Sequence, residues 1–347
     1  MEHIAIDLGG MESQVCIRAA DGSILLEQKK PTRGLEGFFK RRPQSRVILE
    51  TCSEAFRVAD QALAHGHEVR VVAATLVRSL GVGQRGIKTD QRDAQVLSEV
   101  SCRIDLPTVH IRSERSRTWK SLLGMRQALV ESRTQLINSV RGWMRTQLTA
   151  IRTGGVVTFP QRVRDKLLDS PDGMPAFVER QLRVIEELNT QLKEADAEIK
   201  TLAGVDPVCQ RLMTVPGVGP MTSSHFRTVV DDVTRFRSAH DLESYLGLTP
   251  GERSSSTRQR RTGITKAGPS QMRRTLSQAC WAVWRMRPQD PLVQWGRQLA
   301  DRRGKQIANI AMCRKLSGIM YALWRDESTY DASKVSRIVA GTWESKA

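Results

Sequence analysis

Two short apolar runs, each ending in an acidic residue, constrain the fold of this chain more than any other feature. Residues 3–9 (HIAIDLG) and 46–51 (RVILET) have the length and composition of buried strands, and Asp7 and Glu50 mark their ends. Such runs alternate with helical spacing over the first hundred residues, which predicts a mixed sheet flanked by helices, an α/β domain. The other elements expected there are a hairpin of 14–20 and 23–29 around Asp21-Gly22, helices at 35–41 and 54–66, and a strand at 68–73.

The stretch 86–97 (GIKTDQRDAQVL) places Asp90 and Asp93 three residues apart at the expected start of a helix. One interpretation is a helix cap, with acidic side chains at the positive end of the helix. The other is a metal site, because strand ends of an α/β sheet project into a common crevice where Asp7 and Glu50 would meet the two helix acids. Four converging carboxylates repel one another unless cations separate them. The pattern therefore favours two Mg²⁺ ions acting on a phosphodiester, and Mn²⁺ can replace Mg²⁺.

The composition is strongly basic. Lys and Arg number 54 against 37 Asp and Glu, which gives a net charge of +17 and a pI near 10.2. Such an excess favours a polyanionic partner, of which nucleic acid is the commonest and an anionic membrane surface the competitor. Because no apolar run reaches the length of a membrane span and no signal-type segment opens the chain, we expect a cytoplasmic, nucleoid-associated protein without membrane contact. The six cysteines form no CxxC pair, which disfavours zinc ribbons and disulfide frameworks.

From about Ser113 the pattern changes to long helices, interrupted at 154–175 by a segment that contains glycine and proline. Beyond this break an apolar residue recurs every seven positions, and a second apolar series follows three residues after the first. The positions are Val178, Ile185, Leu192 and Ile199, then Leu188, Ala195 and Leu202. Three heptads indicate a coiled-coil hairpin or a dimerisation helix, and a helix pair within one chain is the alternative.

A further section begins near Val205, where residues 216–219 (PGVG) lie between two helical patterns. Such a glycine turn lets backbone amides approach a phosphate, as in helix–hairpin–helix DNA-binding motifs, although it can equally be a simple connection between helices. Downstream, residues 258–276 are loop-like, broken by glycine and densely basic. The residues expected to contact nucleic acid are Lys88, Arg92, Gly217, Gly219, Arg258, Arg260, Arg261, Lys266, Arg273 and Arg274.

In these motifs the chain resembles the DEDD transposases of the insertion-sequence one-ten family, in its one-eleven-eleven branch. In the N-terminal part the resemblance rests on the four acids and on residues 88–94 (KTDQRDA), which match the K-T-D-x-x-D-A signature. In the C-terminal part it rests on 215–220 (VPGVGP), 245–250 (YLGLTP) and 263–268 (GITKAG), the last followed by MRRTL. Both sets of motifs occur in the order typical of that family.

The resemblance implies three sections. These are a RuvC-like, RNase H-type nuclease domain at 1–112, a helical coiled-coil section for dimerisation and nucleic-acid binding at 113–204, and a mostly helical transposase domain at 205–347. It also implies a serine nucleophile between the second and third C-terminal motifs. Spacing from Pro250 forward and from Lys266 backward selects Ser255. The family pattern has glycine at the next position, whereas this chain has Ser256, so Ser254 and Ser256 stay open as substitutes.

As a member of such a family, the protein is expected to be a DNA transposase that cleaves and rejoins DNA by Mg²⁺-assisted serine attack. The resemblance further implies guidance by a structured noncoding bridge RNA that pairs with donor and target DNA, and homodimers that assemble into a tetramer. Two alternatives remain. One is a RuvC-like junction-resolving nuclease with water as nucleophile, and the other is a DNA- or RNA-binding protein without catalytic activity.

Overall fold

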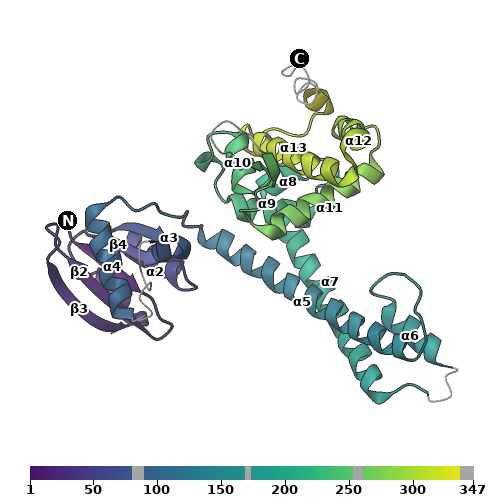
Figure 1. Ribbon diagram of the computed structural model, residues 1–347, viewed down its shortest axis with the longest axis horizontal. Helices are drawn as coiled ribbons and strands as arrows, with labels where there is room; N and C mark the ends of the chain where they lie inside the picture. Colours follow the sequence, from purple (N-terminus) through teal and green to yellow (C-terminus); the bar gives the residue numbers. More distant parts are fainter. Residues whose placement is uncertain (80–89, 169–172, 253–260, 337–347) are drawn as a thin grey trace. The chain divides into compact units, whose positions relative to one another are not determined.

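The computed structural model describes residues 1–79, 90–168, 173–252 and 261–336 of the chain (Figure 1). These residues form two compact units, Met1–Ser113 and Glu114–Ala347, and each unit has its own hydrophobic cores. The division of the second unit into a coiled-coil section and a transposase domain at residue 205 stays a prediction. In the described part of the chain, no helix has both the length and the apolar character that crossing a membrane requires.

The first unit is built on a five-stranded mixed sheet, as the alternating pattern predicts. Its strand order is β3-β2-β1-β4-β5, with β1 antiparallel to β2 and parallel to β4. The bounds are β1 His3–Asp7, β2 Glu12–Arg18, β3 Ile24–Pro31, β4 Arg46–Glu50 and β5 Glu68–Val72. The hairpin of β2 and β3 turns at Gly22, whose φ of 90° belongs to the left-handed region that glycine adopts readily.

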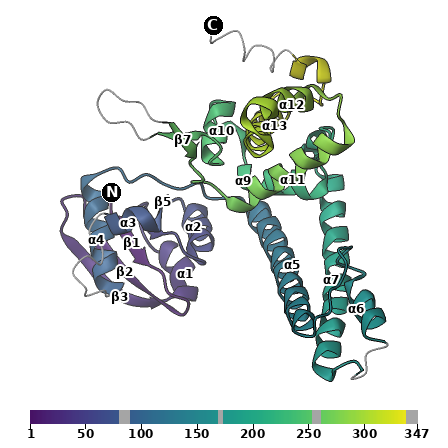
Figure 2. The same ribbon diagram turned by 45° about the vertical axis from the view of Figure 1, so that its right-hand side comes forward.

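Helices cover both faces of this sheet because its central strands alternate between two apolar cores. Ile6 and Leu49 pack against α1 (Leu35–Phe39) and α2 (Ala55–Ala64). Ala5 and Ile48 point to the opposite face and pack with Leu97. That face is covered by α3 (Ala74–Ser79) and α4 (Asp90–Arg103), and a short 3₁₀ turn, η1 (Thr32–Gly34), precedes α1. Figure 2 shows α1 and α2 on one side of the strands and α4 on the other.

In the second unit two long helices, α5 (Glu114–Thr146) and α7 (Ala176–Val205), pack along each other. The first heptad series of α7 is buried within this single chain, from Val178 to Ile199. The heptad repeat therefore forms a helix pair inside one protomer, and dimerisation through this region stays a prediction. The segment expected to be a break holds a helix, α6 (Phe159–Leu167), whose buried Phe159 and Val163 join the same core.

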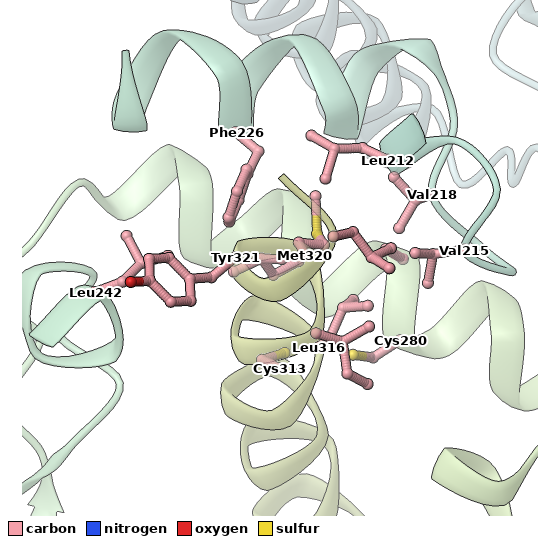
Figure 3. Close-up of a cluster of buried hydrophobic side chains, with 14 of the residues drawn as sticks. Leu212, Val215, Val218, Phe226, Leu242, Cys280, Cys313, Leu316, Met320 and Tyr321 are labelled. Atoms are coloured by element: carbon pink, nitrogen blue, oxygen red, sulfur yellow. The ribbon is translucent and has the colours of Figure 1, made fainter. Parts of the chain in front are cut away.

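The rest of the unit is a helical bundle around α13 (Lys305–Arg325), which Figure 3 shows amid the side chains of its core. Tyr321 on α13 is buried and donates a hydrogen bond to the carbonyl of Phe236 at 2.9 Å, so the core includes one satisfied polar contact. The surrounding elements are α8 (Pro207–Leu212), α9 (Pro220–Val230), η2 (Val233–Arg235), α10 (Ala239–Tyr245), α11 (Ser270–Met286) and α12 (Pro291–Arg303).

The basic segment 258–276 is more ordered than its composition predicts. Strand β7 (Arg261–Ile264) pairs antiparallel with β6 (Pro250–Glu252), and α11 already begins at Ser270. The loop expectation is therefore wrong for 261–264 and 270–276 and is confirmed for 265–269, whereas 258–260 lie outside the described residues. Ribbon pairing and a buried helix face outweigh the local signals of glycine and charge.

Candidate active site

The two strand acids lie side by side at one edge of the sheet. Asp7 is the last residue of β1 and Glu50 the last of β4, and the parallel pairing of these strands reaches Ile6 opposite Leu49. One step further along this register brings Asp7 opposite Glu50, on strands that lie about 4.8 Å apart. Both side chains are half-buried. By alternation they belong to the face of Ala5 and Ile48, which is the face that α4 covers.

Helix α4 runs antiparallel to β1, and every fourth residue of the helix faces every second residue of the strand. At one end Ser101 meets His3, with its Oγ 2.8 Å from Nδ1, and in the middle Leu97 packs in one cluster with Ala5. Four residues of helix rise about 6 Å and two residues of strand about 6.6 Å, so the next step brings Asp93 level with Asp7. Asp93 is only 3% exposed. The structure thus brings Asp7, Glu50 and Asp93 to the same end of one sheet face.

The fourth predicted acid is placed by its backbone alone. Asp90 lies on α4, as expected, and is the first residue of that helix in the described part of the chain; its side chain lies outside that part, as does Lys88. Among the described residues no group of three or more His, Cys, Asp or Glu side chains has the spacing of a metal site. The donor set itself consists of carboxylates, the hard oxygen ligands that Mg²⁺ prefers. The metal site stays a prediction that the arrangement of the backbone favours.

The predicted nucleophile belongs to a segment carried by the β6–β7 ribbon. Glu252 pairs with Arg261, so the residues that flank the segment 253–260 are neighbours in the ribbon. Ser254, Ser255 and Ser256 lie outside the described residues, and so do Arg258 and Arg260 and the side chain of Arg261. The roles predicted for these residues remain untested.

The ribbon is held to the helical bundle by a close crossing of two backbones. A Cβ on Gly268 would overlap the carbonyl oxygen of Tyr245, so only glycine allows this approach. Arg273 of α11 secures the crossing, since its Nη1 donates to the carbonyls of Leu246 at 3.1 Å and Gly268 at 2.6 Å. Burial lowers the pKa of the Arg273 guanidinium. Arg273 therefore has a structural contact that its sequence context did not indicate, and a nucleic-acid role for it stays a prediction.

The PGVG turn lies between α8 and α9, as expected for a turn between two helical patterns. Gly217 has a φ of 82°, and a Cβ there would lie 2.7 Å from the carbonyl oxygen of Ala279 on α11. The glycine is thus required for close packing inside the bundle. Gly219 is the N-cap residue of α9 and has open space around its Cα. Only this second glycine is positioned in a way that leaves a backbone approach to phosphate possible.

The remaining basic candidates lie on the surface. Lys266 is exposed, with a φ of 56°, and its backbone N–H donates to the carbonyl of Gly247 at 3.1 Å. The side chain of Arg274 is 57% exposed, and its Nη1 lies 4.0 Å from Oε1 of Glu131 on α5. Arg92 is exposed on α4. These positions are compatible with contact to a polyanion, which their sequence context predicts.

A polar pocket among α5, α9 and α11 was not anticipated from the sequence. Its lining includes His225 and Gln278, which no motif singles out. The residues come from segments about 50 to 150 positions apart in the chain. No local pattern marks such a site, because only the packing of three helices creates it.

Comparison with known proteins places the chain in a family. A DEDD transposase model of the IS110 type, described as a transposase, matches residues 4–148, and a model described as the transposase IS116/IS110/IS902 family matches residues 209–293. The first match contains the strand acids and α4, and the second contains the PGVG turn and the ribbon.

Full-length relatives agree with these matches. The chain is 27% identical to the "Probable family 20 transposase" of Pseudomonas aeruginosa, over 95% of this chain and 98% of that protein. It is 28% identical to the transposase for insertion sequence element IS1111A of Coxiella burnetii, over 82% and 79% of the two chains. It is also 26% identical to the pilin gene-inverting protein of Moraxella lacunata, over 79% and 78%. The chain belongs to the IS110 family of DNA transposases.

Proposed function

We propose that this protein cleaves and rejoins DNA by attack of Ser255 on a phosphodiester bond. Divalent metal ions, Mg²⁺ or Mn²⁺, would be held by Asp7, Glu50, Asp90 and Asp93. The observation that carries this proposal is the register of the first unit, which brings Asp7, Glu50 and Asp93 to the same end of one sheet face. Metal bound there stabilises negative charge on the phosphate oxygens during cleavage.

A serine nucleophile explains how DNA is rejoined without an external energy source. Ser255 Oγ forms an ester bond to phosphorus while the bond from phosphorus to the displaced strand oxygen breaks. The serine proton passes to a nearby base, and the displaced oxygen leaves as a hydroxyl. Attack by a hydroxyl from another strand reverses these changes and restores a phosphodiester. The basic residues around the serine, from Arg258 to Lys266, would bind the phosphate.

The acids and the serine belong to different units of the chain, so the catalytic site is composite. We infer that it forms when protomers assemble, as a homodimer and then a tetramer that holds two DNA molecules. A bridge RNA that pairs with donor and target DNA would supply sequence specificity. The protein would bind backbone and shape, for which the net charge of +17 is suited.

One relative favours rejoining over hydrolysis. The Moraxella protein is named for gene inversion, and an inverted segment must be joined again at both of its ends. A junction-resolving nuclease that uses water would leave free ends. This similarity is the reason to prefer strand transfer over simple cleavage for the present chain.

The experiment is to incubate the full chain with DNA carrying its element ends, its adjacent RNA and Mg²⁺, and to analyse the products on denaturing gels. The wild-type protein should give cleaved DNA and a covalent protein–DNA adduct. Ser255→Ala should lose the adduct and keep DNA binding, whereas Ser254→Ala and Ser256→Ala should retain the adduct. Asp7→Asn and Asp90→Asn should suppress cleavage at saturating DNA by at least about a hundredfold, because each removes a metal ligand without changing side-chain volume.

Glu36→Gln is the matched control, since it removes an acid of the same unit that lies on α1 and is 61% exposed. Its cleavage activity should equal that of the wild type. An adduct that persists in Ser255→Ala would overturn the role of Ser255, and full activity of Asp7→Asn in Mg²⁺ would overturn the metal site. Products with free ends and no adduct in the wild type would favour the water-dependent nuclease.

A further inference from the structure

A polar pocket lies where α5, α9 and α11 meet in the second unit. In Figure 2 the N-terminal end of α5 reaches α9 and α11 at this junction. The volume of the pocket is about 160 Å³, below the roughly 300–1,000 Å³ typical of drug-sized ligands but sufficient for one ring system. Its lining is Leu123, Arg126, Gln127 and Val130 from α5, Met221 and His225 from α9, and Gln271, Arg274, Thr275 and Gln278 from α11.

His225 is a buried polar side chain of this pocket. It is 9% exposed, and within the part of the chain that the structure describes its ring has no hydrogen-bond partner. Burial, with a smaller contribution from Arg126, lowers its pKa to about 4. The imidazole is therefore neutral at physiological pH and offers one donor and one acceptor. Neither ring nitrogen is fully enclosed, so water or a ligand that enters the pocket can complete its hydrogen bonds.

The other polar groups of the lining are also suited to a neutral ligand. The side-chain amides of Gln271 and Gln278 have no partner among the residues whose side chains are described, and each carries both donors and an acceptor. An anion would use only donors and would be repelled by the acceptors. The positive charge of Arg126 is already engaged, because its Nε lies 2.9 Å from Oδ1 of Asp196.

One cation remains at the rim of the pocket. Arg274 is largely exposed, and its only ion pair among the described residues is the long 4.0 Å contact to Glu131. An arginine here can bind a phosphate that stays in solvent while the attached base enters the pocket. The apolar side chains of Leu123, Val130 and Met221 provide surface for the faces of such a base.

We propose that this pocket holds the base of one unpaired nucleotide, with His225 and the glutamine amides on its polar edge and Arg274 on its phosphate. The inference rests on the proposed function only for the class of ligand, nucleic acid, and it concerns a site distinct from the acids and the serine. The nucleotide can come from single-stranded DNA or from RNA, since the chemistry named here is common to both.

The test uses the full chain and short single strands in which every position is abasic except a central 2-aminopurine. Fully abasic strands of the same length serve as reference, and each strand is made with deoxyribose and with ribose. The wild-type protein should bind the base-containing strand about tenfold more tightly than the abasic one. Preference for the ribose or the deoxyribose strand identifies RNA or DNA as the source, and both outcomes support the pocket.

Three variants and two controls make this result specific. Gln278→Leu and His225→Leu should abolish the preference for the base, and Arg274→Ala should weaken both strands. Arg285→Ala removes an exposed arginine from the last turn of the same helix, outside the pocket, and should keep the preference. Asp7→Asn should also keep it, so that loss of cleavage and loss of base binding are separable.

Equal binding of base-containing and abasic strands by the wild-type protein would overturn the proposal. An unchanged preference in folded Gln278→Leu and His225→Leu would do the same. Tryptophan fluorescence verifies folding, because all seven tryptophans lie in the second unit, at positions 119, 143, 281, 284, 295, 324 and 343.

Discussion

The end of the sheet that carries the acids in the first unit and the contact of α5, α8 and α9 in the second unit are built in different ways. At that end of the sheet, Asp7 and Glu50 lie opposite each other at the ends of two adjacent parallel strands, and α4 packs on those strands through the apolar side chain of Leu97. In the second unit, contacts between charged side chains join α5, α8 and α9, which are distant in sequence. Asp206, 1% exposed, caps α8 and lies 2.7 Å from the guanidinium of Arg115 on α5.

The difference shows that the polar side chains of the first unit are positioned by apolar packing, whereas those of the second unit themselves stabilise the packing of helices. In the first unit an apolar core sets the position of the strands and of the helix that carry the acids. In the second unit buried polar contacts contribute to the packing itself, because Asp206 also attracts Arg227 of α9 across 3.6 Å. The two units should therefore respond in opposite ways to apolar and polar substitutions.

The largest effect is expected from Leu97→Ala, which removes a side chain that is 1% exposed between α4 and the sheet. It should lower the free energy of unfolding of the first unit by about 3–4 kcal/mol through lost burial and a cavity. Ser101→Ala on the same helix should cost only about 1 kcal/mol, the value of its hydrogen bond to His3. Hydrogen exchange of the β1 amides measures both. Equal costs would break the comparison.

A somewhat smaller loss is expected from Asp206→Ala, which removes a helix cap and the partner of two arginines at once. The free energy of unfolding of the second unit should fall by about 3 kcal/mol. Asp206→Asn keeps the capping oxygen and should recover roughly half of this loss. Urea unfolding followed by tryptophan fluorescence reports this unit alone. An alanine variant as stable as the wild type would show that the ionic contacts are dispensable.

The smallest effect concerns pH. The pKa of His225 is about 4 in the folded protein and 6.5 for an ordinary histidine, so between these values the unfolded chain binds a proton that the folded chain does not. Stability is therefore unaffected above pH 6.5 and falls as the pH drops below it. Between pH 7.5 and 5.0 the wild type should lose about 2 kcal/mol more than His225→Leu. Parallel losses measured by tryptophan fluorescence would show that His225 titrates normally.

Much of the first unit could be predicted because its pattern is local. Apolar runs of strand length, the Asp21-Gly22 turn and the helical segment that contains Asp93 each lie within a few residues of the structure they determine. The predicted order of strand, hairpin and strand–helix–strand led to the sheet and to Asp7 and Glu50 at its edge. The position of Asp93 beside Asp7 follows only from the contacts of Leu97 and Ser101 with β1. These contacts cannot be read from the sequence.

The second unit was less predictable because its contacts join distant segments. The glycine and proline residues of 154–175 predicted a break, although the sequence also carries a helix signal. Phe159, Val163 and Leu167 recur every four residues, and a proline lies in the first turn, where a helix tolerates it. The charge of 258–276 concealed both β7 and the start of α11. Arg273 resembles a phosphate ligand in sequence, yet its guanidinium lies on two backbone carbonyls. Whether an arginine side chain such as that of Arg273 binds solvent, a ligand or backbone carbonyls depends on the packing around it, which the sequence does not show.

Four residues of α4 span nearly the same length as two residues of β1, and this match limits which mutations the chain can accept during evolution. Inserting or deleting one residue between Asp93 and Leu97 would rotate the aspartate by about 100° around the helix axis while the leucine stayed anchored on the sheet. A substitution there can be gradual in its effect, but a change of length would remove the carboxylate from its neighbours in a single step.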